Sequence, residues 1–252
     1  MNINIDTGSL LSTAAGQTTS IVNGQTIMTS VIQPAIVKNN GNPFDVTIRF
    51  QKPHDGIKQI ALKNAQIPVG FYNIRSPYNT ITLGATTYTI TPGNYAASNL
   101  IAALNTVTSS VGTWSINSVV QFVSSSGSLT LTVPTGLTYP TLANFLGYTQ
   151  SVTGTTLTAP NPYLINFDTY INIYLDNIGR PSIDPSKSTF KIPINGGTVI
   201  QWAENNQDEQ SIMVHDNASV DRLIVAVYDR YGQPMNNNGL DWSFTIRITT
   251  AN

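Results

Sequence analysis

The feature that most constrains the fold is a strict alternation of apolar and polar residues in several separate stretches. It is clearest over residues 44–50 (FDVTIRF) and 242–248 (WSFTIRI), where every second residue is large and apolar. Successive side chains of a β-strand point to opposite faces of a sheet, so this pattern is typical of strands with one buried face. Further strands are expected over residues 57–67, 169–175 and 222–228. The chain is therefore predicted to be built mainly from β-sheets.

Shorter stretches complete the expected set of strands, and a single region of some length has the period of a helix. The additional strands are expected over residues 78–83, 86–91, 114–123, 129–133, 189–194 and 198–202. Apolar residues from Leu100 to Val107 recur at helical spacing after the turn Pro92-Gly93-Asn94. This spacing predicts a helix of about three turns with Asn94 as its N-cap. A shorter helical turn over residues 142–146 is expected to end at Gly147.

Together these elements predict an all-β fold: a single jelly roll, or two-sheet antiparallel sandwich, with one inserted short helix. We expect this domain to span residues 44–252, after an N-terminal arm or irregular extension over residues 1–43. The Thr-rich stretch 149–162 is expected to be a surface loop of that domain. Residues 1–37 carry a single charge, Asp6. Two interpretations of them remain open: an irregular segment with no special role, or an arm that becomes ordered against a partner subunit.

The composition argues against an enzyme and favours a structural building block. The chain has only 12 basic and 13 acidic residues, whereas Asn and Thr together number 58 of its 252 residues. About a quarter of a typical soluble domain is charged, and enzymes need titratable groups in their clefts. A surface of neutral hydroxyls and amides suits a protein that is covered by neighbouring subunits.

The same counts exclude several partners and cofactors. The net charge is −1 and the Lys and Arg residues are scattered, which argues against a nucleic-acid partner. The absence of cysteine excludes disulfides, thiolate zinc sites and cysteine nucleophiles. No apolar run is long enough to span a membrane, and the start of the chain does not resemble a secretory signal, so synthesis in a cytoplasm is expected.

Few residues have the spacing that catalysis requires. His54 and His215 are each expected in a loop, outside any metal-ligand cluster. The acidic groupings of interest are residues 208–209 (Asp-Glu) and Asp216 with Asp221. We interpret them as parts of solvated turns rather than as the two facing carboxylates of a glycosidase. We therefore predict no catalytic residue.

No cofactor or metal site is predicted either. The loop from Asp176 to Ser186 contains Asp184 but lacks the regular acidic spacing of a cation-binding loop, so a simple connecting turn is expected.

Aromatic residues leave one alternative open, a carbohydrate-binding β-sandwich or an attachment protein similar to a fibre knob. Most tyrosines, such as Tyr88 and Tyr174, fall within expected strands, where packing explains them. The aromatic residues that suit stacking against a sugar are Trp202 and Tyr231, which lies in the tip, here defined as the loop over residues 231–239 between the last two expected strands. That tip is expected to expose Tyr231 and Met235, either as a plain long hairpin or as a contact loop for a neighbouring subunit.

Three motifs together resemble a known family. The first runs from Lys58 to Ile74 and includes the phrase "L-x-x-A-x-I-P-x-x-x-Y-N-I", the second is Pro92-Gly93-Asn94-Tyr95 at a helix start, and the third is Leu146-Gly147-Tyr148. The ending over residues 223–244 fits the same pattern. Over residues 44–250 the chain resembles penton and minor capsid proteins of virophages, polinton-like viruses and large nucleocytoplasmic DNA viruses.

The resemblance implies a structural role in a virion. It implies a single jelly roll that assembles as a homopentamer at the fivefold vertices of an icosahedral capsid. Its neighbours there would be trimers of a double-jelly-roll major capsid protein. No catalytic, cofactor-binding or metal-binding residue comes with such a family.

Overall fold

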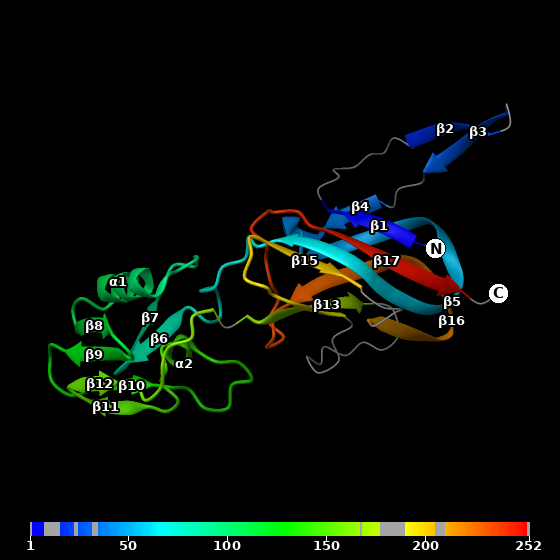
Figure 1. The fold of residues 1–252 in the computed structure, drawn as a ribbon. Coiled ribbons are helices and arrows are strands. Elements are labelled where there is room, and N and C mark those ends of the chain that lie inside the picture. Colours follow the sequence, from blue (N-terminus) through cyan, green and yellow to red (C-terminus); the bar gives the residue numbers. More distant parts are fainter. Residues whose placement is uncertain are drawn as a thin grey trace. The chain divides into compact units, whose positions relative to one another are not determined.

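The protein is an all-β structure, as predicted, in a computed structural model that describes residues 2–7, 16–22, 25–31, 35–166, 168–176, 190–204 and 210–250. The strand pairs of the described residues are antiparallel, and the sheets enclose hydrophobic cores in the manner of a jelly-roll sandwich. The chain divides into two compact units (Figure 1). The first unit comprises residues 1–71 and 169–252, and the second, here called the insert, comprises residues 72–168.

The first unit is one eight-stranded sheet whose central members are two long strands. Its order is β1 (Asn2–Asp6), β17 (Ser243–Thr250), β5 (Asp45–Pro68), β16 (Ser211–Tyr228), β13 (Tyr170–Asp176) and β14 (Phe190–Pro193), with β4 (Ala35–Lys38) and β15 (Val199–Ala203) also paired to β5. A short 3₁₀ turn, η1 (Asn39–Gly41), precedes β5, and β2 (Gly16–Val22) pairs with β3 (Gln25–Val31) as a separate hairpin.

Strand β5 joins two stretches that the sequence predicts as separate strands. Its first part, over 45–49, pairs with β4 and the end of β16, and its second part, over 57–68, pairs with β17 and β15. The pairing with β17 shifts register at Lys58 and at Lys63, each of which is an extra residue in β5. Each extra residue reverses which side chains face inward. This reversal explains why Ile60 and Leu62 are buried at even positions, whereas Ala65 and Ile67 are buried at odd ones.

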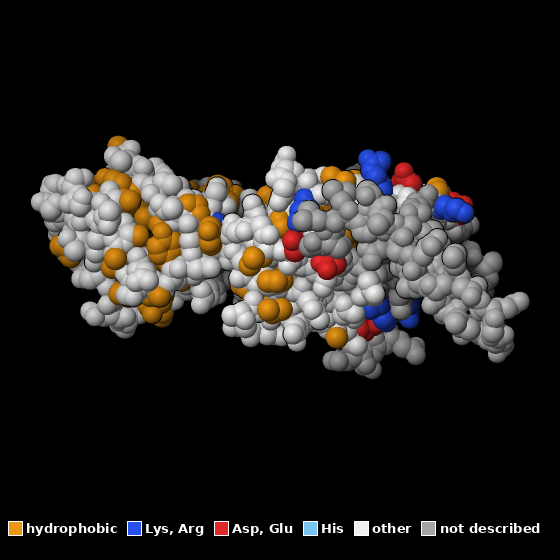
Figure 2. Space-filling view, turned by 90° about the horizontal axis from the view of Figure 1, so that it is seen from above, with side chains coloured by type: hydrophobic (Ala, Val, Ile, Leu, Met, Phe, Trp, Pro, Cys, Tyr) orange, Lys and Arg blue, Asp and Glu red, His pale blue; other side chains and the backbone are white. Residues whose placement is uncertain are grey.

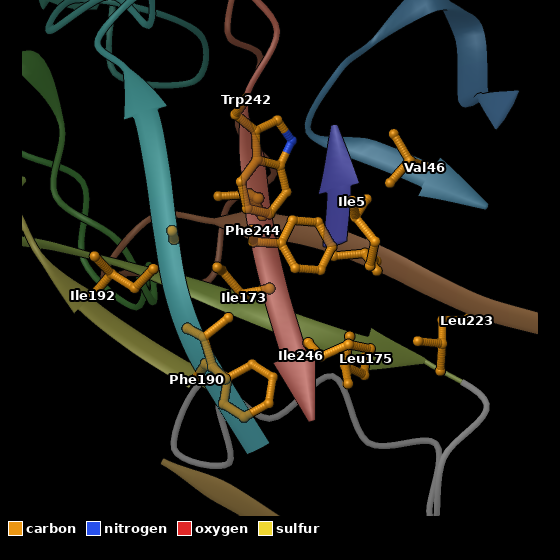
Figure 3. Close-up of a cluster of buried hydrophobic side chains, with 14 of the residues drawn as sticks. Ile5, Val46, Ile173, Leu175, Phe190, Ile192, Leu223, Trp242, Phe244 and Ile246 are labelled. Carbon is orange, nitrogen blue, oxygen red and sulfur yellow. The ribbon is translucent and has the colours of Figure 1, made fainter. Parts of the chain in front are cut away.

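Inward side chains from the two parts of β5, β13, β16 and β17 form the core of the first unit (Figure 3). Phe244 and Ile246 are 2% and 0% exposed, as the alternation over 242–248 predicts. The indole of Trp242 packs edge-on against Phe44, and its Nε1 donates a hydrogen bond to the carbonyl oxygen of Pro43 at 2.6 Å. Each fully buried side chain of this size contributes about 1.5–3 kcal/mol.

The insert has a core of its own between two smaller sheets. One sheet has the order β11 (Val152–Gly154), β10 (Leu129–Thr132), β6 (Thr80–Leu83) and β7 (Thr86–Thr89), and the other has the order β12 (Thr156–Thr158), β9 (Val120–Ser124) and β8 (Gly112–Ile116). Helices α1 (Ala97–Val107) and α2 (Leu142–Phe145) pack against the same core. Neither helix, nor any other in the described parts of the chain, has the length and apolarity needed to cross a membrane.

Several expectations for the insert are wrong in detail. The strand expected over 114–123 is the β8–β9 hairpin, because Asn117 and Ser118 turn the chain between them. The loop expected over 149–162 contains β11 and β12, since its threonines pair with β10 and β9. Helix α1 begins at Ala97 rather than after Asn94.

Some of the described residues of the expected N-terminal arm form strands of the sheet. Strand β1 pairs along its whole length with β17, and β4 pairs with β5. The Thr7 hydroxyl lies 3.1 Å from the carbonyl oxygen of Trp242 and accepts a hydrogen bond from the Trp242 amide at 2.8 Å. The boundary between residues 43 and 44 therefore stays a prediction, with parts of residues 1–43 already incorporated in the sheet.

Gly147 ends α2 as predicted, and it offers a test of the packing in the insert. Its φ is +98°, and an added Cβ would overlap the carbonyl oxygen of Asn161. Gly136 has a similar φ of +79° with no atom within 4 Å of an added Cβ. Replacing Gly136 by Ala should cost about 1–2 kcal/mol through the backbone alone. Gly147→Ala should cost about 2 kcal/mol more, because a clash with backbone is added.

The comparison is made by calorimetric unfolding of both variants. Equal losses in the two variants would show that the contact between Gly147 and Asn161 does not constrain the insert.

Candidate assembly surface

The residues considered for chemistry do not form a catalytic or metal site among those the structure describes. His54 lies in β5 and His215 in β16, so the expectation that both occupy loops is wrong. The His54 ring packs edge-on against Phe50 at a centroid distance of 4.8 Å. Asp221 is exposed on β16. Within the described ranges, no group of three His, Asp or Glu side chains is arranged to hold a metal ion.

The remaining acidic candidates lie largely outside the described residues. Residues 208–209 lie there, as does Asp184 together with the rest of 177–189, and the side chain of Asp216 is likewise not described. The backbone of Asp176 ends strand β13. The hypothesis of a simple connecting turn over 176–186 therefore stays a prediction.

The residues considered for a sugar-binding surface pack against other parts of the protein. Trp202 lies in β15 and packs against the core of the first unit. Tyr231 is partly buried, and the guanidinium carbon of Arg230 lies 5.0 Å from the centre of its ring. Met235 is only 1% exposed, so the expectation that it is exposed is wrong. It is buried because the tip folds back onto the core of the first unit.

Buried amide and carboxylate groups hold that tip in place. Asp229 is fully buried, and its Oδ1 accepts hydrogen bonds from the backbone amides of Tyr231 and Gln233 at 2.8 and 2.9 Å. Asn237 is also fully buried, and its Oδ1 accepts a hydrogen bond from the Gly70 amide at 2.9 Å. A Cβ at Gly70 would lie 2.5 Å from the Asn237 carbonyl oxygen. These bonds hold the tip in a defined conformation, and its role as a contact loop for a neighbouring subunit stays a prediction.

Charge is distributed very unevenly along the chain. Residues 72–168 contain one basic residue, Arg75, and one acidic residue, Asp168, while the other 11 basic and 12 acidic residues lie in the first unit. On the face shown in Figure 2, most of the red and blue side chains gather on one part of the surface, and a large region shows almost only white and orange. The scarcity of charged residues is thus most pronounced in the insert. This difference between the two units can already be counted in the sequence.

The two charges of the insert neutralise each other in its interior. Arg75 Nη1 donates hydrogen bonds to Asp168 Oδ2 at 2.8 Å and to the Tyr72 carbonyl oxygen at 2.7 Å. The side chains of Arg75 and Asp168 are only 10% and 7% exposed. The guanidinium carbon also lies 5.3 Å from the centre of the Tyr78 ring. Almost no formal charge of the insert reaches its surface.

The neutral polar groups inside the insert are paired in a similar way. The Tyr148 hydroxyl is fully buried and donates a hydrogen bond to the Leu157 carbonyl oxygen at 2.8 Å. Burial raises the pKa of this phenol well above its ordinary value, so it remains neutral. Trp114 Nε1 donates a hydrogen bond to Thr108 Oγ1 at 3.0 Å.

Two of the family-like motifs meet at the point where the chain enters the insert. The Asn73 amide donates a hydrogen bond to Asn94 Oδ1, and Asn73 Nδ2 donates one to the Tyr95 carbonyl oxygen. Ile74 and Gly93 exchange two backbone hydrogen bonds of 3.1 and 2.9 Å. The side-chain oxygen of Asn94 therefore accepts a hydrogen bond from Asn73 and does not cap α1. These motifs have a structural role in the insert.

The outer surface of the four-stranded sheet in the insert consists of threonine side chains. We call this surface the threonine face and define it by Thr80, Thr82, Thr87, Thr89, Thr130, Thr132 and Thr153. The residues between them, such as Ile81 and Leu131, point into the core. Neighbouring hydroxyls are bonded to each other across the strands, with oxygen–oxygen distances of 2.9 Å from Thr82 to Thr87 and 2.8 Å from Thr130 to Thr153.

The outer surface of the three-stranded sheet is also neutral but has an apolar centre. We call it the valine face and define it by Thr113, Ser115, Gln121, Val123, Thr156 and Thr158. Val123 is 45% exposed and lies on the middle strand, directly between Thr113 and Thr156. Gln121 Nε2 donates a hydrogen bond to Thr158 Oγ1 at 3.0 Å. The two faces cover opposite sides of one core, because the inner residues of both sheets pack together there.

Comparison with known proteins gives a distant similarity of fold only. No protein-family model matches the chain, and no curated protein matches its sequence. The fold is similar to the crystal structure of a mavirus penton protein, with a TM-score of 0.47 and 9% sequence identity over 86% of this chain and 98% of that one. A similarity at this level supports no statement about what this chain binds or assembles with.

The buried pair of Arg75 and Asp168 is predicted to stabilise the insert strongly. Arg75→Met leaves a buried carboxylate without its cationic partner and should lower the free energy of unfolding by about 3–5 kcal/mol. The double variant with Asp168→Leu should recover most of that loss, because no charge then remains buried. Calorimetry measures both effects.

Arg49→Met is the matched control, since Arg49 is exposed on β5 and its replacement should change stability by less than about 0.5 kcal/mol. A loss in Arg75→Met no larger than in Arg49→Met would contradict the role assigned to the pair.

Proposed function

We propose that this chain is a structural subunit of a viral capsid rather than an enzyme. The observation that carries the proposal is the insert, residues 72–168, whose only two charged side chains pair with each other in its interior. Catalysis of proton transfer needs suitably placed titratable groups in a cleft, and this part of the chain has no histidine and keeps its two charged side chains in the interior. A large neutral surface is instead suited to contact with other subunits, since few charges need to be desolvated.

The proposed assembly is a penton, a homopentamer at the fivefold vertices of an icosahedral capsid. The motifs over residues 58–74, 92–95 and 146–148 support this assignment, because their resemblance is to penton and minor capsid proteins. A subunit in a closed ring uses two different surfaces to contact its two neighbours, so identical copies bury unlike faces. In the virion the pentamer would contact trimers of the major capsid protein, after synthesis in the host cytoplasm.

The stoichiometry of the purified full-length chain tests this function. Native mass spectrometry and electron microscopy should show rings of five copies, formed alone or after addition of major capsid protein trimers. A chain that remains monomeric at high concentration, with and without those trimers, would contradict the proposal.

A glycan array tests the alternative of a carbohydrate-binding or attachment protein. We expect no specific signal, because Met235 is buried in the core of the first unit and Trp202 packs against that core. A specific signal that disappears in Trp202→Ala, combined with a monomeric chain, would favour the alternative instead.

A further inference from the structure

The insert presents two broad surfaces for which its own fold provides no cover. The threonine face and the valine face are the outer surfaces of its two sheets, and α1 and α2 pack against the core between them. Four of the seven threonines on the first face are partly buried, and Thr87, Thr89 and Thr153 are exposed. On the valine face, Val123 exposes 45% of its surface among polar neighbours. An exposed apolar centre with a polar rim is the arrangement found in protein interfaces.

The threonine face can be covered at little cost in free energy. A buried hydroxyl without a partner is unfavourable, but Thr82 bonds Thr87 and Thr130 bonds Thr153 within the face itself. Four of the seven hydroxyls are thus paired within the face. A second protein surface that packs on it has to supply correspondingly fewer hydrogen bonds.

The chemistry of the face also indicates what kind of partner fits. Sugar sites rely on aromatic rings for stacking and on free hydrogen-bonding groups, whereas here the side chain of Tyr88 points toward the core and hydroxyls are bonded to one another. A strongly charged partner would find no opposite charge on the insert, because Arg75 and Asp168 are buried. An identical copy fits well, since two such neutral surfaces meet without repulsion between like charges.

We propose that the threonine face of one copy packs on the valine face of the next copy in a ring. The inference rests on the proposed function, because it names the contact through which the copies associate. The two faces are different and lie on opposite sides of one core, which is the geometry that a head-to-tail interface requires. Val123 is then the apolar anchor, and it inserts among the methyl groups around Thr82.

A set of matched lysine substitutions tests this contact. Thr82→Lys places a charge within the threonine face, Val123→Lys places one at the centre of the valine face, and Thr106→Lys is the control on the exposed side of α1. Association is measured by sedimentation velocity, and folding is checked by calorimetry. Thr82→Lys and Val123→Lys should each weaken association at least about tenfold, because a charge is buried without a partner. Thr106→Lys should associate as the unmodified chain does.

A charge-pair variant tests whether the two faces meet each other. A chain that carries both Thr82→Lys and Val123→Glu places opposite charges on the two sides of every head-to-tail contact. It should associate more tightly than the chain with Thr82→Lys alone or the chain with Val123→Glu alone. If the double variant is no better than the singles, the pairing of these two faces is wrong.

The outcomes separate this inference from the proposed function. If the unmodified chain forms rings and the Thr82→Lys and Val123→Lys variants form them equally well, the copies associate elsewhere and only the inference is wrong. If the unmodified chain forms no rings under any condition, the proposed function is wrong, and the inference with it.

Discussion

The ion pair between Arg75 and Asp168 is the interaction on which the character of the insert depends. It joins residues near the two ends of a segment that runs from 72 to 168, at a nitrogen–oxygen distance of 2.8 Å. Asn73 and Asn166 are hydrogen-bonded at 3.2 Å beside it. The pair thus links the beginning of the insert to its end. It also keeps the only two formal charges of that segment away from the surface. One contact therefore accounts both for the closure of the insert and for its neutral exterior.

The rest of the insert is consistent with that neutrality. Its buried polar groups, such as the Tyr148 hydroxyl and Trp114 Nε1, bond to other groups of the insert. Its exposed threonines are partly bonded to each other. The first unit is different, because it carries nearly all of the charge together with the long strands β5 and β16. The charged residues of the chain are therefore concentrated in one unit, whereas the other unit is almost without formal charge at its surface.

Much of this fold could be predicted from the sequence, and the failures have physical causes. The alternation over 44–50 and 242–248 specifies which side chains are buried, and Gly147 marks the end of a helix because its φ of +98° suits glycine. Periodicity could not show that 44–50 and 57–67 form one strand, because residues 51–56 (QKPHDG) carry no apolar alternation and the pairing with β16 shifts register there. It also could not show the two separate cores, since a strand of either unit has the same alternation. Met235 was expected at the surface because its burial depends on how the tip folds back, which local sequence does not specify.

The candidate surface was in part visible in the sequence. The scarcity of charged residues is evident from the composition. Counting along the chain also shows that nearly all of the charged residues lie outside residues 72–168. The threonine face could not be predicted, because it requires β10 and β11 to pair beside β6, although β10 begins more than 40 residues after β6 ends.

In the proposed assembly, copies of this chain associate through neutral surfaces and not through charge. The dependence of the association constant on salt distinguishes the two, because charges in water interact over about 10 Å at 0.1 M salt but only over about 3 Å at 1 M. Between 0.05 and 1 M sodium chloride we expect the association constant of the full-length chain to stay constant or to rise slightly. A steep fall over that range would show that charged groups, and not the neutral faces of the insert, hold the copies together.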